Sequence, residues 1–149
     1  MTERVALRPR GPAPDMVEAE GGCHCGAVRF RTRLAQGLAT AGRCTCSYCR
    51  VKGSISVTVA EGGFQLLSGE DSLGTYHFGT GVAAHHFCRV CGINTHHHRS
   101  SVPGQVAVSA ACLDGVSPFD FLELPVWEGE RETPPGQDVL AGVLRYSPA

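Results

Sequence analysis

The sequence lacks long hydrophobic runs, and this absence excludes several classes of protein. Of its 149 residues 42% are hydrophobic, yet no apolar stretch approaches the roughly 20 residues that a membrane-spanning helix needs. The N-terminus also lacks the apolar centre and the small-residue cleavage site of a secretory signal. We therefore expect a cytoplasmic protein with no membrane partner.

An excess of charge of one sign is missing as well. The chain has 13 lysines and arginines against 14 aspartates and glutamates, which gives a formal net charge of −1. A protein that holds nucleic acid through a basic surface needs an excess of positive charge. We therefore expect no nucleic-acid partner.

Segments with the period of an amphipathic helix are scarce, whereas short alternating stretches and turn residues are frequent. Residues 27–33 alternate apolar residues with arginine, which predicts a half-buried strand whose arginines face water, and residues 54–59 alternate in the same way. Further strands are predicted at 64–67, 73–78, 84–87, 93–98 and 105–110, with turns at 61–63, 68–71, 79–81 and 101–104. This pattern indicates a mainly β fold.

The length of the chain suits one ordinary domain. Residues 1–20 contain three prolines and no apolar run, which is typical of a segment outside a packed core. We expect residues 1–20 to be a flexible arm and residues 21–149 to form a single β domain.

Cysteine is abundant: the chain has eight, and seven of them fall into three tight clusters. The clusters hold Cys23 and Cys25; Cys44, Cys46 and Cys49; and Cys88 and Cys91. Cysteines two residues apart are hard to join by a disulfide without strain, whereas two thiolates on one turn suit a metal ion. A closed zinc site takes four sulfurs, and an open one takes three protein ligands plus water or substrate, so seven cysteines divide into one site of each kind.

Spacing favours one grouping of these cysteines over another. Cys88 and Cys91, followed by Gly92, form a zinc-knuckle turn, which needs a second pair of sulfurs. If the pair is Cys23 and Cys25, all three cysteines of the central trio remain available for a second ion. In a rival grouping Cys88 and Cys91 bind the ion together with two cysteines of the trio, and the third is left without a metal. The eighth cysteine follows the apolar residues 106–110, and there we expect a buried, unreactive thiol.

Five stretches together resemble a known family. They are 21–28 (GGCHCGAV), 44–50 (CTCSYCR), 87–92 (FCRVCG), 95–100 (THHHRS) and 111–121 (ACLDGVSPFDF). In this order they are similar to the glutathione-dependent formaldehyde-activating (GFA) family, also called the CENP-V/GFA domain, over about residues 21–126. Thr45 departs from the pattern, because the family often has histidine there.

The resemblance implies a zinc-bound Mss4-like β fold and two zinc ions per chain. One ion would be structural, on Cys23, Cys25, Cys88 and Cys91. The other would be catalytic, on Cys44, Cys46 and Cys49. The implied activity is that of a carbon–sulfur lyase or synthase whose partners are a small thiol and an aldehyde, with glutathione as co-substrate and S-hydroxymethylglutathione as the adduct.

Other residues are candidates for contacts with such a substrate. Glutathione carries two carboxylates, and Arg50, Lys52 and Arg99 are cations close in sequence to the motifs. His96 and His98 would share one face of a strand, with the histidine between them on the other, and either could act as general acid or base.

Two readings without catalysis stay open. Both zinc sites could be structural in a module that binds a partner, and a protein side chain as fourth ligand of the second ion would favour that reading. Alternatively the trio could serve as a zinc store or redox sensor, which requires a weakly held ion or easily oxidised sulfurs.

Overall fold

The computed structural model describes residues 17–100, 102, 104–130 and 138–147, and it confirms the mainly β fold. Besides one short helix, α1 (Ser47–Lys52), it has three 3₁₀ turns at Glu70–Ser72, Ala110–Cys112 and Pro118–Asp120. The strands are β1 (Glu18–Gly22), β2 (Arg29–Leu38), β3 (Arg43–Cys44), β4 (Ser56–Ser68), β5 (Leu73–Tyr76), β6 (Ala84–Cys88), β7 (Asn94–His98), β8 (Val106–Ser109), β9 (Glu123–Trp127) and β10 (Leu140–Arg145). In the described part of the chain, no helix is long and apolar enough to cross a bilayer.

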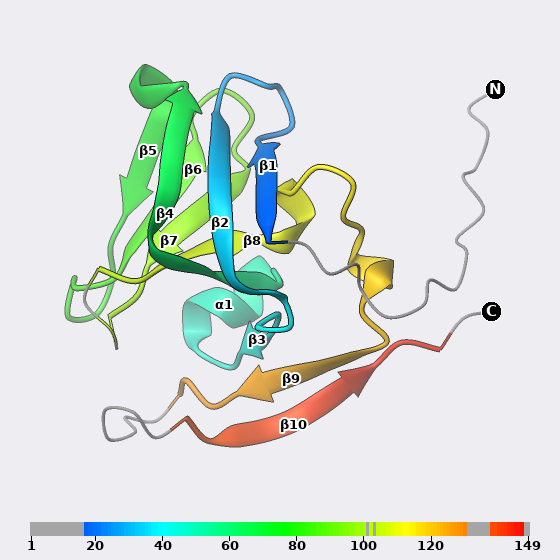
Figure 1. Ribbon diagram of the computed structural model, residues 1–149. Coiled ribbons are helices and arrows are strands. Elements are labelled where there is room, and N and C mark those ends of the chain that lie inside the picture. Colours follow the sequence, from blue (N-terminus) through cyan, green and yellow to red (C-terminus); the bar gives the residue numbers. More distant parts are fainter. Residues whose placement is uncertain (1–16, 101, 103, 131–137, 148–149) are drawn as a thin grey trace, which may run out of the picture.

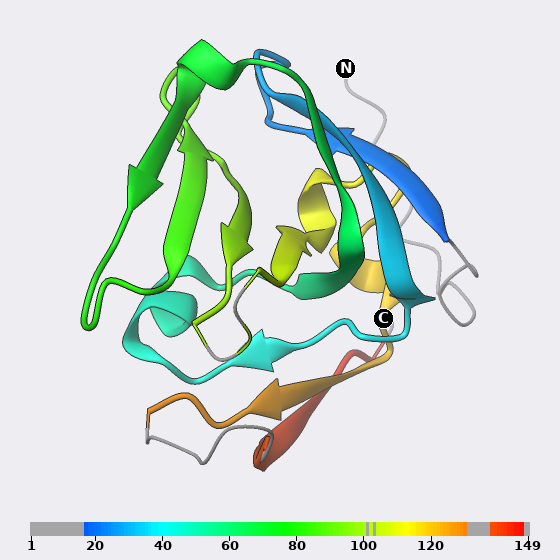
Figure 2. The ribbon, with the colours of Figure 1, turned by 60° about the vertical axis from the view of Figure 1, so that its left-hand side comes forward.

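The strands form two sheets (Figures 1 and 2). The larger sheet has seven strands in the order β1-β2-β4-β8-β7-β6-β5, and the smaller has the order β10-β9-β3. Strand β4 joins the two halves of the large sheet, because its first residues pair with β8 and the remainder pairs with β2. The small sheet lies beside α1, and its strand β3 carries the first cysteine of the trio (Figure 1).

Strand β4 corrects one prediction. A turn is predicted at 61–63, but the backbone passes through these residues as one 13-residue strand. The pairing with β2 steps from Leu34↔Val59 to Thr32↔Phe64, so the extra residues of β4 form a bulge there. Gly62, at φ 68°, supplies the left-handed conformation that the bulge requires. The glycines therefore bend a strand instead of ending it.

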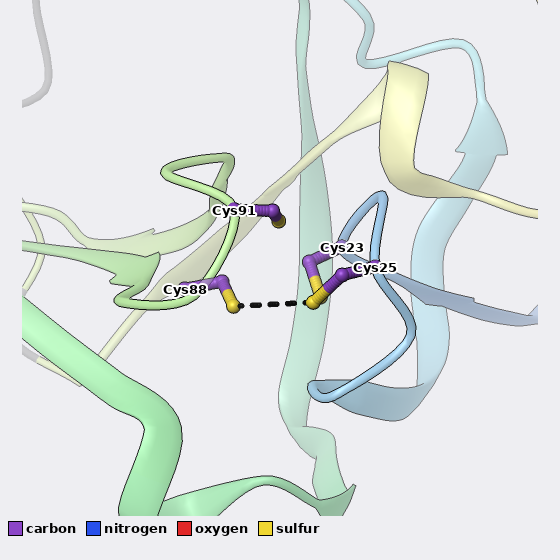
Figure 3. A group of neighbouring side chains, drawn as sticks. All are labelled: Cys23, Cys25, Cys88 and Cys91. Atoms are coloured by element: carbon purple, nitrogen blue, oxygen red, sulfur yellow. Dashed lines mark hydrogen bonds between the residues drawn. The ribbon is translucent and has the colours of Figure 1, made fainter.

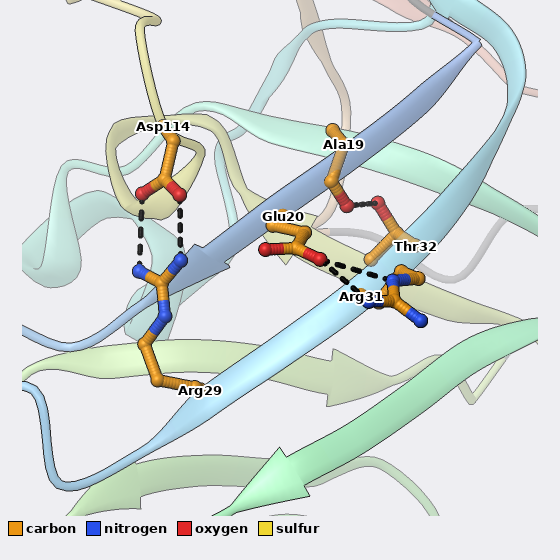
Figure 4. A network of polar contacts seen from close by, with 6 residues as sticks. All are labelled: Ala19, Glu20, Arg29, Arg31, Thr32 and Asp114. Atoms are coloured by element: carbon orange, nitrogen blue, oxygen red, sulfur yellow. Dashed lines mark hydrogen bonds and ion pairs between the residues drawn. The ribbon is translucent and has the colours of Figure 1, made fainter.

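Strand β2 shows the alternation predicted at 27–33. Phe30 is fully buried, while the side chains of Arg29 and Arg31 keep 34% and 53% of their surface exposed. Figure 4 shows where the arginines lead: Arg31 reaches its cross-strand neighbour Glu20 at 2.7 Å, and Arg29 forms a two-pronged pair with Asp114 at 2.6 and 3.0 Å. Such exposed pairs contribute little stability.

Strand β1 also moves the boundary of the predicted arm. Residues Glu18 to Glu20 pair with β2, so the folded domain begins before residue 21. Ala19 alternates with two glutamates and packs in the core, a pattern too short to be recognised in the sequence. The earlier part of the arm lies outside the described residues.

The main core lies between the large sheet and the segments that follow β8. Its buried side chains come mostly from β2, β4 and β8 and from residues 110–124. A second, smaller cluster contains Val28 with Cys23 and Cys88, and it lies at the four-cysteine group.

Candidate metal centres

Four cysteines converge from two turns that are far apart in the sequence (Figure 3). Cys23 and Cys25 lie in the turn between β1 and β2, and Cys88 and Cys91 lie in the turn between β6 and β7. All four sulfurs lie within 4.8 Å of one another, with Cys23–Cys25 at 3.6 Å and Cys25–Cys88 at 3.8 Å. A tetrahedral zinc ion with Zn–S bonds of about 2.3 Å places its sulfurs about 3.8 Å apart, whereas a disulfide needs about 2.05 Å. These residues therefore fit a closed zinc site.

Backbone N–H groups donate hydrogen bonds to sulfurs of this group. The N–H of Val28 donates to Cys23 Sγ at 3.3 Å, and the N–H of Val90 donates to Cys88 Sγ at 3.4 Å. In the second turn Gly92 has φ 78°, the conformation expected at the exit of a zinc knuckle. Such donors stabilise thiolates, which is the form that a metal binds.

The remaining cluster forms a second group on a single loop. Cys44 ends β3, Cys46 is the N-cap of α1, and Cys49 lies in its first turn. The N–H of Cys46 donates to Cys44 Sγ at 3.4 Å, and the N–H of Cys49 donates to Cys46 Sγ at 3.3 Å. The three sulfurs lie within 4.8 Å of one another, and among the described residues no histidine, carboxylate or fourth cysteine joins them.

The electrostatics of this trio also fit a divalent cation. Hydrogen bonds from Cys44 and Cys49 lower the pKa of Cys46, whereas the same kind of contacts raise the pKa of Cys49. Cys46 therefore forms a thiolate easily, and the negative charge on its sulfur keeps the neighbouring cysteines protonated. Three thiolates can coexist only if a positive ion offsets their repulsion, and zinc would supply that charge.

Thr45 ties the trio to the end of β9. Its hydroxyl accepts a hydrogen bond from the N–H of Gly129 at 2.9 Å and donates to Glu128 Oε1 at 3.2 Å, while its own N–H donates to Trp127 O at 3.0 Å. Gly129 lies against the trio so closely that a Cβ there would collide with Cys44 Sγ. The small sheet thus acts as a support for the cysteine loop.

Tyr48 anchors the other side of the loop. Its ring lies 4.2 Å from the ring of His85 and stacks on Phe78 at 5.5 Å and Tyr76 at 5.6 Å, measured between centroids. The side-chain amide of Asn94 donates to its hydroxyl at 3.4 Å. These contacts pack α1 against β5, β6 and β7, so the trio is held from both sides.

Comparison with known proteins adds the family. A family model described as glutathione-dependent formaldehyde-activating enzyme matches residues 18–123, which is most of the chain. The chain belongs to this family. A crystal structure of a Rhodobacter sphaeroides protein, a Northeast Structural Genomics target, is 46% identical with a TM-score of 0.70 and covers 72% of this chain and 98% of that one. The predicted family and fold are both confirmed.

The three cations that were predicted to bind glutathione have very different surroundings in this member of the formaldehyde-activating family. Lys52 is half-buried, donates to Asn94 Oδ1 at 3.3 Å and lies over the ring of Tyr48. Burial lowers its pKa, while negative charge on the trio, from Cys49 above all, acts in the opposite direction. Arg99 is also half-buried and donates to Thr58 Oγ1 at 3.1 Å. Burial lowers the pKa of Arg99 too, and charge on Cys44 and Cys49 raises it.

Arg50 differs from these two cations. It is exposed and faces Glu130 at 3.5 Å, a pair that offers little preorganised charge. The structure therefore brings Lys52 and Arg99, but not Arg50, into the partly buried surroundings of the trio.

The histidines divide between the two faces of the sheet. His96 and His98 do share a face, but there His96 stacks on Phe64 at 4.3 Å and on His86 at 4.5 Å, away from Tyr48. His97 lies on the other face, stacked on His85 at 5.3 Å. The histidines nearest the cysteine loop are thus His85 and His97, and a catalytic role for His96 or His98 stays a prediction.

Sequence reasoning missed His85, which is only 4% exposed. In the described structure neither of its ring nitrogens has a hydrogen-bond partner, and burial lowers its pKa to about 4. The signal was available in the alternation of β6 and β7, but only the pairing of these strands shows which histidines face Tyr48.

A cleft of about 670 Å³ lies beside the four-cysteine group, because Cys23 is one of its lining residues. Its walls include His24, Arg29, Lys52, Asn94 and Asp114. No cysteine of the trio lines the cleft, but Lys52, the last residue of the helix that carries Cys49, does. The eighth cysteine, Cys112, also lines the cleft; it is 8% exposed, donates to Asn94 O at 3.4 Å, and has a pKa that burial raises to about 11, which agrees with an unreactive thiol.

Proposed function

We propose that this protein is a zinc-dependent carbon–sulfur lyase or synthase that acts on adducts of glutathione with formaldehyde or a related aldehyde. The family acts on these two small molecules, and this agrees with the predicted partners. The observation that carries the proposal is the cysteine trio, which offers three sulfurs and, in the described part of the chain, no fourth protein ligand. A site with a free position can accept a thiol.

The reaction needs a thiolate, a carbonyl and two proton transfers. Zinc on the trio would lower the pKa of the incoming thiol and supply the thiolate at neutral pH. In the synthetic direction the glutathione sulfur forms a bond to the formaldehyde carbon, the C=O π pair moves to oxygen, and that oxygen takes up a proton. In the reverse direction the carbon–sulfur bond breaks and the same proton leaves.

The residues of the chain bind and orient the substrate. Lys52 and Arg99 place positive charge beside the trio, where the carboxylates of glutathione would bind. The cleft beside Lys52 is within the usual size range of a small-molecule site, about 300–1,000 Å³, and is the proposed seat of the peptide part. Burial lowers the pKa of His85 and His97 to about 4 and about 3, so both imidazoles are neutral and only weakly basic near pH 7, and the thiol proton leaves to solvent.

Two cysteine variants test the proposal. In Cys46→Ser we expect the chain to stay folded, to lose one zinc and to lose catalysis. In Cys88→Ser we expect unfolding, because the four-sulfur site joins distant parts of the sheet and structural zinc supplies folding free energy directly. The measurements are zinc per chain, circular dichroism, and the exchange rate between ¹³C-formaldehyde and its glutathione adduct by NMR, with protein-free buffer as the baseline for the spontaneous reaction.

The outcome separates the proposal from its alternatives. Full exchange activity in Cys46→Ser would exclude the mechanism. A wild-type protein that holds zinc on the trio but never exceeds the buffer rate would favour a non-enzymatic zinc module. Rapid loss of zinc with oxidation of the trio would favour a sensor. We expect the protein to act in the cytoplasm, where its cysteines remain reduced.

A further inference from the structure

Six of the seven histidines lie between residues 77 and 98, and two of them meet on the face of the sheet away from the cysteine trio. His86, on β6, and His98, on β7, are diagonal neighbours, since Ala84 pairs with His98 and His86 pairs with His96. His86 Nε2 and His98 Nδ1 lie 2.9 Å apart. The side chain of His98 is exposed and that of His86 is half-buried, so an ion in solution can reach both nitrogens.

A neighbouring threonine offers a hydrogen-bond acceptor to the ring nitrogen of His86 that lies away from His98. Thr75 is the cross-strand partner of His86 on β5, and its Oγ1 lies 3.0 Å from His86 Nδ1. When Nδ1–H donates to this oxygen, Nε2 carries the lone pair and faces His98. This is the arrangement that metal-bound histidines show, in which the second ring nitrogen is held by a hydrogen bond.

The ring of His86 is also held by stacking on the buried ring of His96. His96, which is 4% exposed, stacks on His86 at 4.5 Å between centroids, and its own Nδ1 lies 2.9 Å from Thr95 Oγ1. His86 is therefore a preoriented ligand, while the exposed His98 is free to adjust. Preorganisation of one ligand reduces the entropy that binding must overcome.

The geometry points to a divalent metal site on His86 and His98, separate from both cysteine groups and independent of the proposed enzymatic function. Two imidazole nitrogens about 2.0–2.1 Å from a tetrahedral ion lie about 3.3–3.4 Å apart. The present 2.9 Å contact needs only a small opening, which the exposed His98 can make. On metal binding the proton of His98 moves from Nδ1 to Nε2, and Nε2 has no hydrogen-bond partner among the described residues. His86 Nε2 and His98 Nδ1 then both replace water on the ion.

The ligand class follows from the donors. Neutral imidazole suits Zn²⁺, Ni²⁺ and Cu²⁺, whereas Mg²⁺ and Ca²⁺ prefer oxygen. The described cluster supplies two protein ligands, so water completes the coordination and the ion stays exchangeable. The site therefore takes a first-row transition metal ion from solution.

The test is a calorimetric titration of the zinc-loaded wild-type chain with Ni²⁺ at neutral pH. Absorbance from nickel–thiolate charge transfer is recorded in parallel, because its absence shows that the cysteine groups are not the site. We expect one Ni²⁺ per chain beyond the zinc. His98→Asn should weaken binding at least about tenfold, and Thr75→Val, which removes the partner of Nδ1, should weaken it by about tenfold as well.

His77→Gln is the matched control. This exposed histidine lies in the turn after β5, where its Nδ1 bonds to the carbonyls of Gly81 and Ala83 at 3.1 and 2.9 Å, so its loss should leave Ni²⁺ binding unchanged. Unchanged affinity in His98→Asn, or no Ni²⁺ uptake beyond the cysteine groups in the wild type, would overturn the proposal. Equal loss in His77→Gln would show that the histidine cluster binds as a whole and that the pair is not the site.

Discussion

Thr45 shows how much one side chain between two ligands can do. The family often has histidine at this position, and here a hydroxyl takes its place. That hydroxyl accepts from the N–H of Gly129 and donates to Glu128, so it links the cysteine loop to β9. Thr45 therefore provides a hydrogen-bond bridge beside the trio and adds no titratable group there.

Removal of this bridge should weaken metal binding by the trio. Thr45→Val keeps the shape of the side chain but loses both hydrogen bonds, and we expect a loss of about 1 kcal/mol in unfolding free energy. The affinity of the trio for zinc, measured by competition with a chelator, should fall as well. Thr80→Val, at an exposed threonine in the turn between β5 and β6, is the control. Equal behaviour of the two variants would contradict a supporting role for Thr45.

At the scale of elements, the cysteine loop depends on two neighbours that are distant in sequence. Strand β9 runs parallel to β3 and pairs Trp127 with Cys44, which brings Gly129 against the sulfur of Cys44. On the other side, β5, β6 and the turn between them supply the rings that surround Tyr48. The geometry of the trio is thus set by packing between elements as well as by the spacing of its cysteines.

A pair of glycine variants tests the contribution of β9. In Gly129→Ala the new Cβ collides with Cys44 Sγ, so we expect the trio to lose its zinc while the four-sulfur site keeps its own. In Gly142→Ala, on the neighbouring strand β10, the Cβ meets open space and zinc content should not change. Zinc per chain, measured by elemental analysis, checks both. Retention of all zinc in Gly129→Ala would show that the loop adjusts without cost.

At the scale of the whole molecule, the four-sulfur group joins strands that are far apart in the order of the large sheet. Its cysteines come from the turn between β1 and β2 and from the turn between β6 and β7, near opposite ends of the strand order. A bound ion would hold these ends together, and the small cluster around Val28 adds little apolar packing to do so. This is the physical reason for the expected unfolding of Cys88→Ser.

The buried histidines make the stability of the molecule depend on pH. Burial lowers the pKa of His96 to about 3 in the folded state, whereas an unfolded histidine titrates near 6.5. Between these values the unfolded chain binds the extra proton, so unfolding free energy falls as pH drops through this window, by up to about 1.4 kcal/mol per pH unit for this group. Above pH 7 both states are neutral and the contribution vanishes.

His96→Leu should therefore have a shallower loss of stability than the wild type between pH 7 and pH 5. Urea unfolding midpoints at several pH values measure the slope, and the difference between the two proteins cancels the contribution of the cysteines, which both share. The control is His77→Leu, at an exposed histidine that does not lie next to a cysteine. Parallel slopes in wild type and His96→Leu would contradict the burial of a neutral imidazole.

Some features could be predicted because they are local. The gathering of seven cysteines on three metal-binding turns follows from spacings of two or three residues, and the alternation in 27–33 reports a half-buried strand directly. Others depend on partners far away in the chain. The length of β4 is decided by its register with β2, and the start of the domain at Glu18 is decided by pairing with Arg33.

The amino-acid sequence by itself determined the chemistry of the protein: that three cysteine turns can bind metal, which family the motifs resemble, and that the fold is built from short strands. Tertiary structure decided the surroundings of that chemistry. It placed His85 beside Tyr48 and His97 beside His85, put Gly129 against Cys44 and set His86 against His98. The physical reason is that the spacing of ligands on one turn fixes their geometry, whereas the contacts between strands depend on register and on which face each side chain takes.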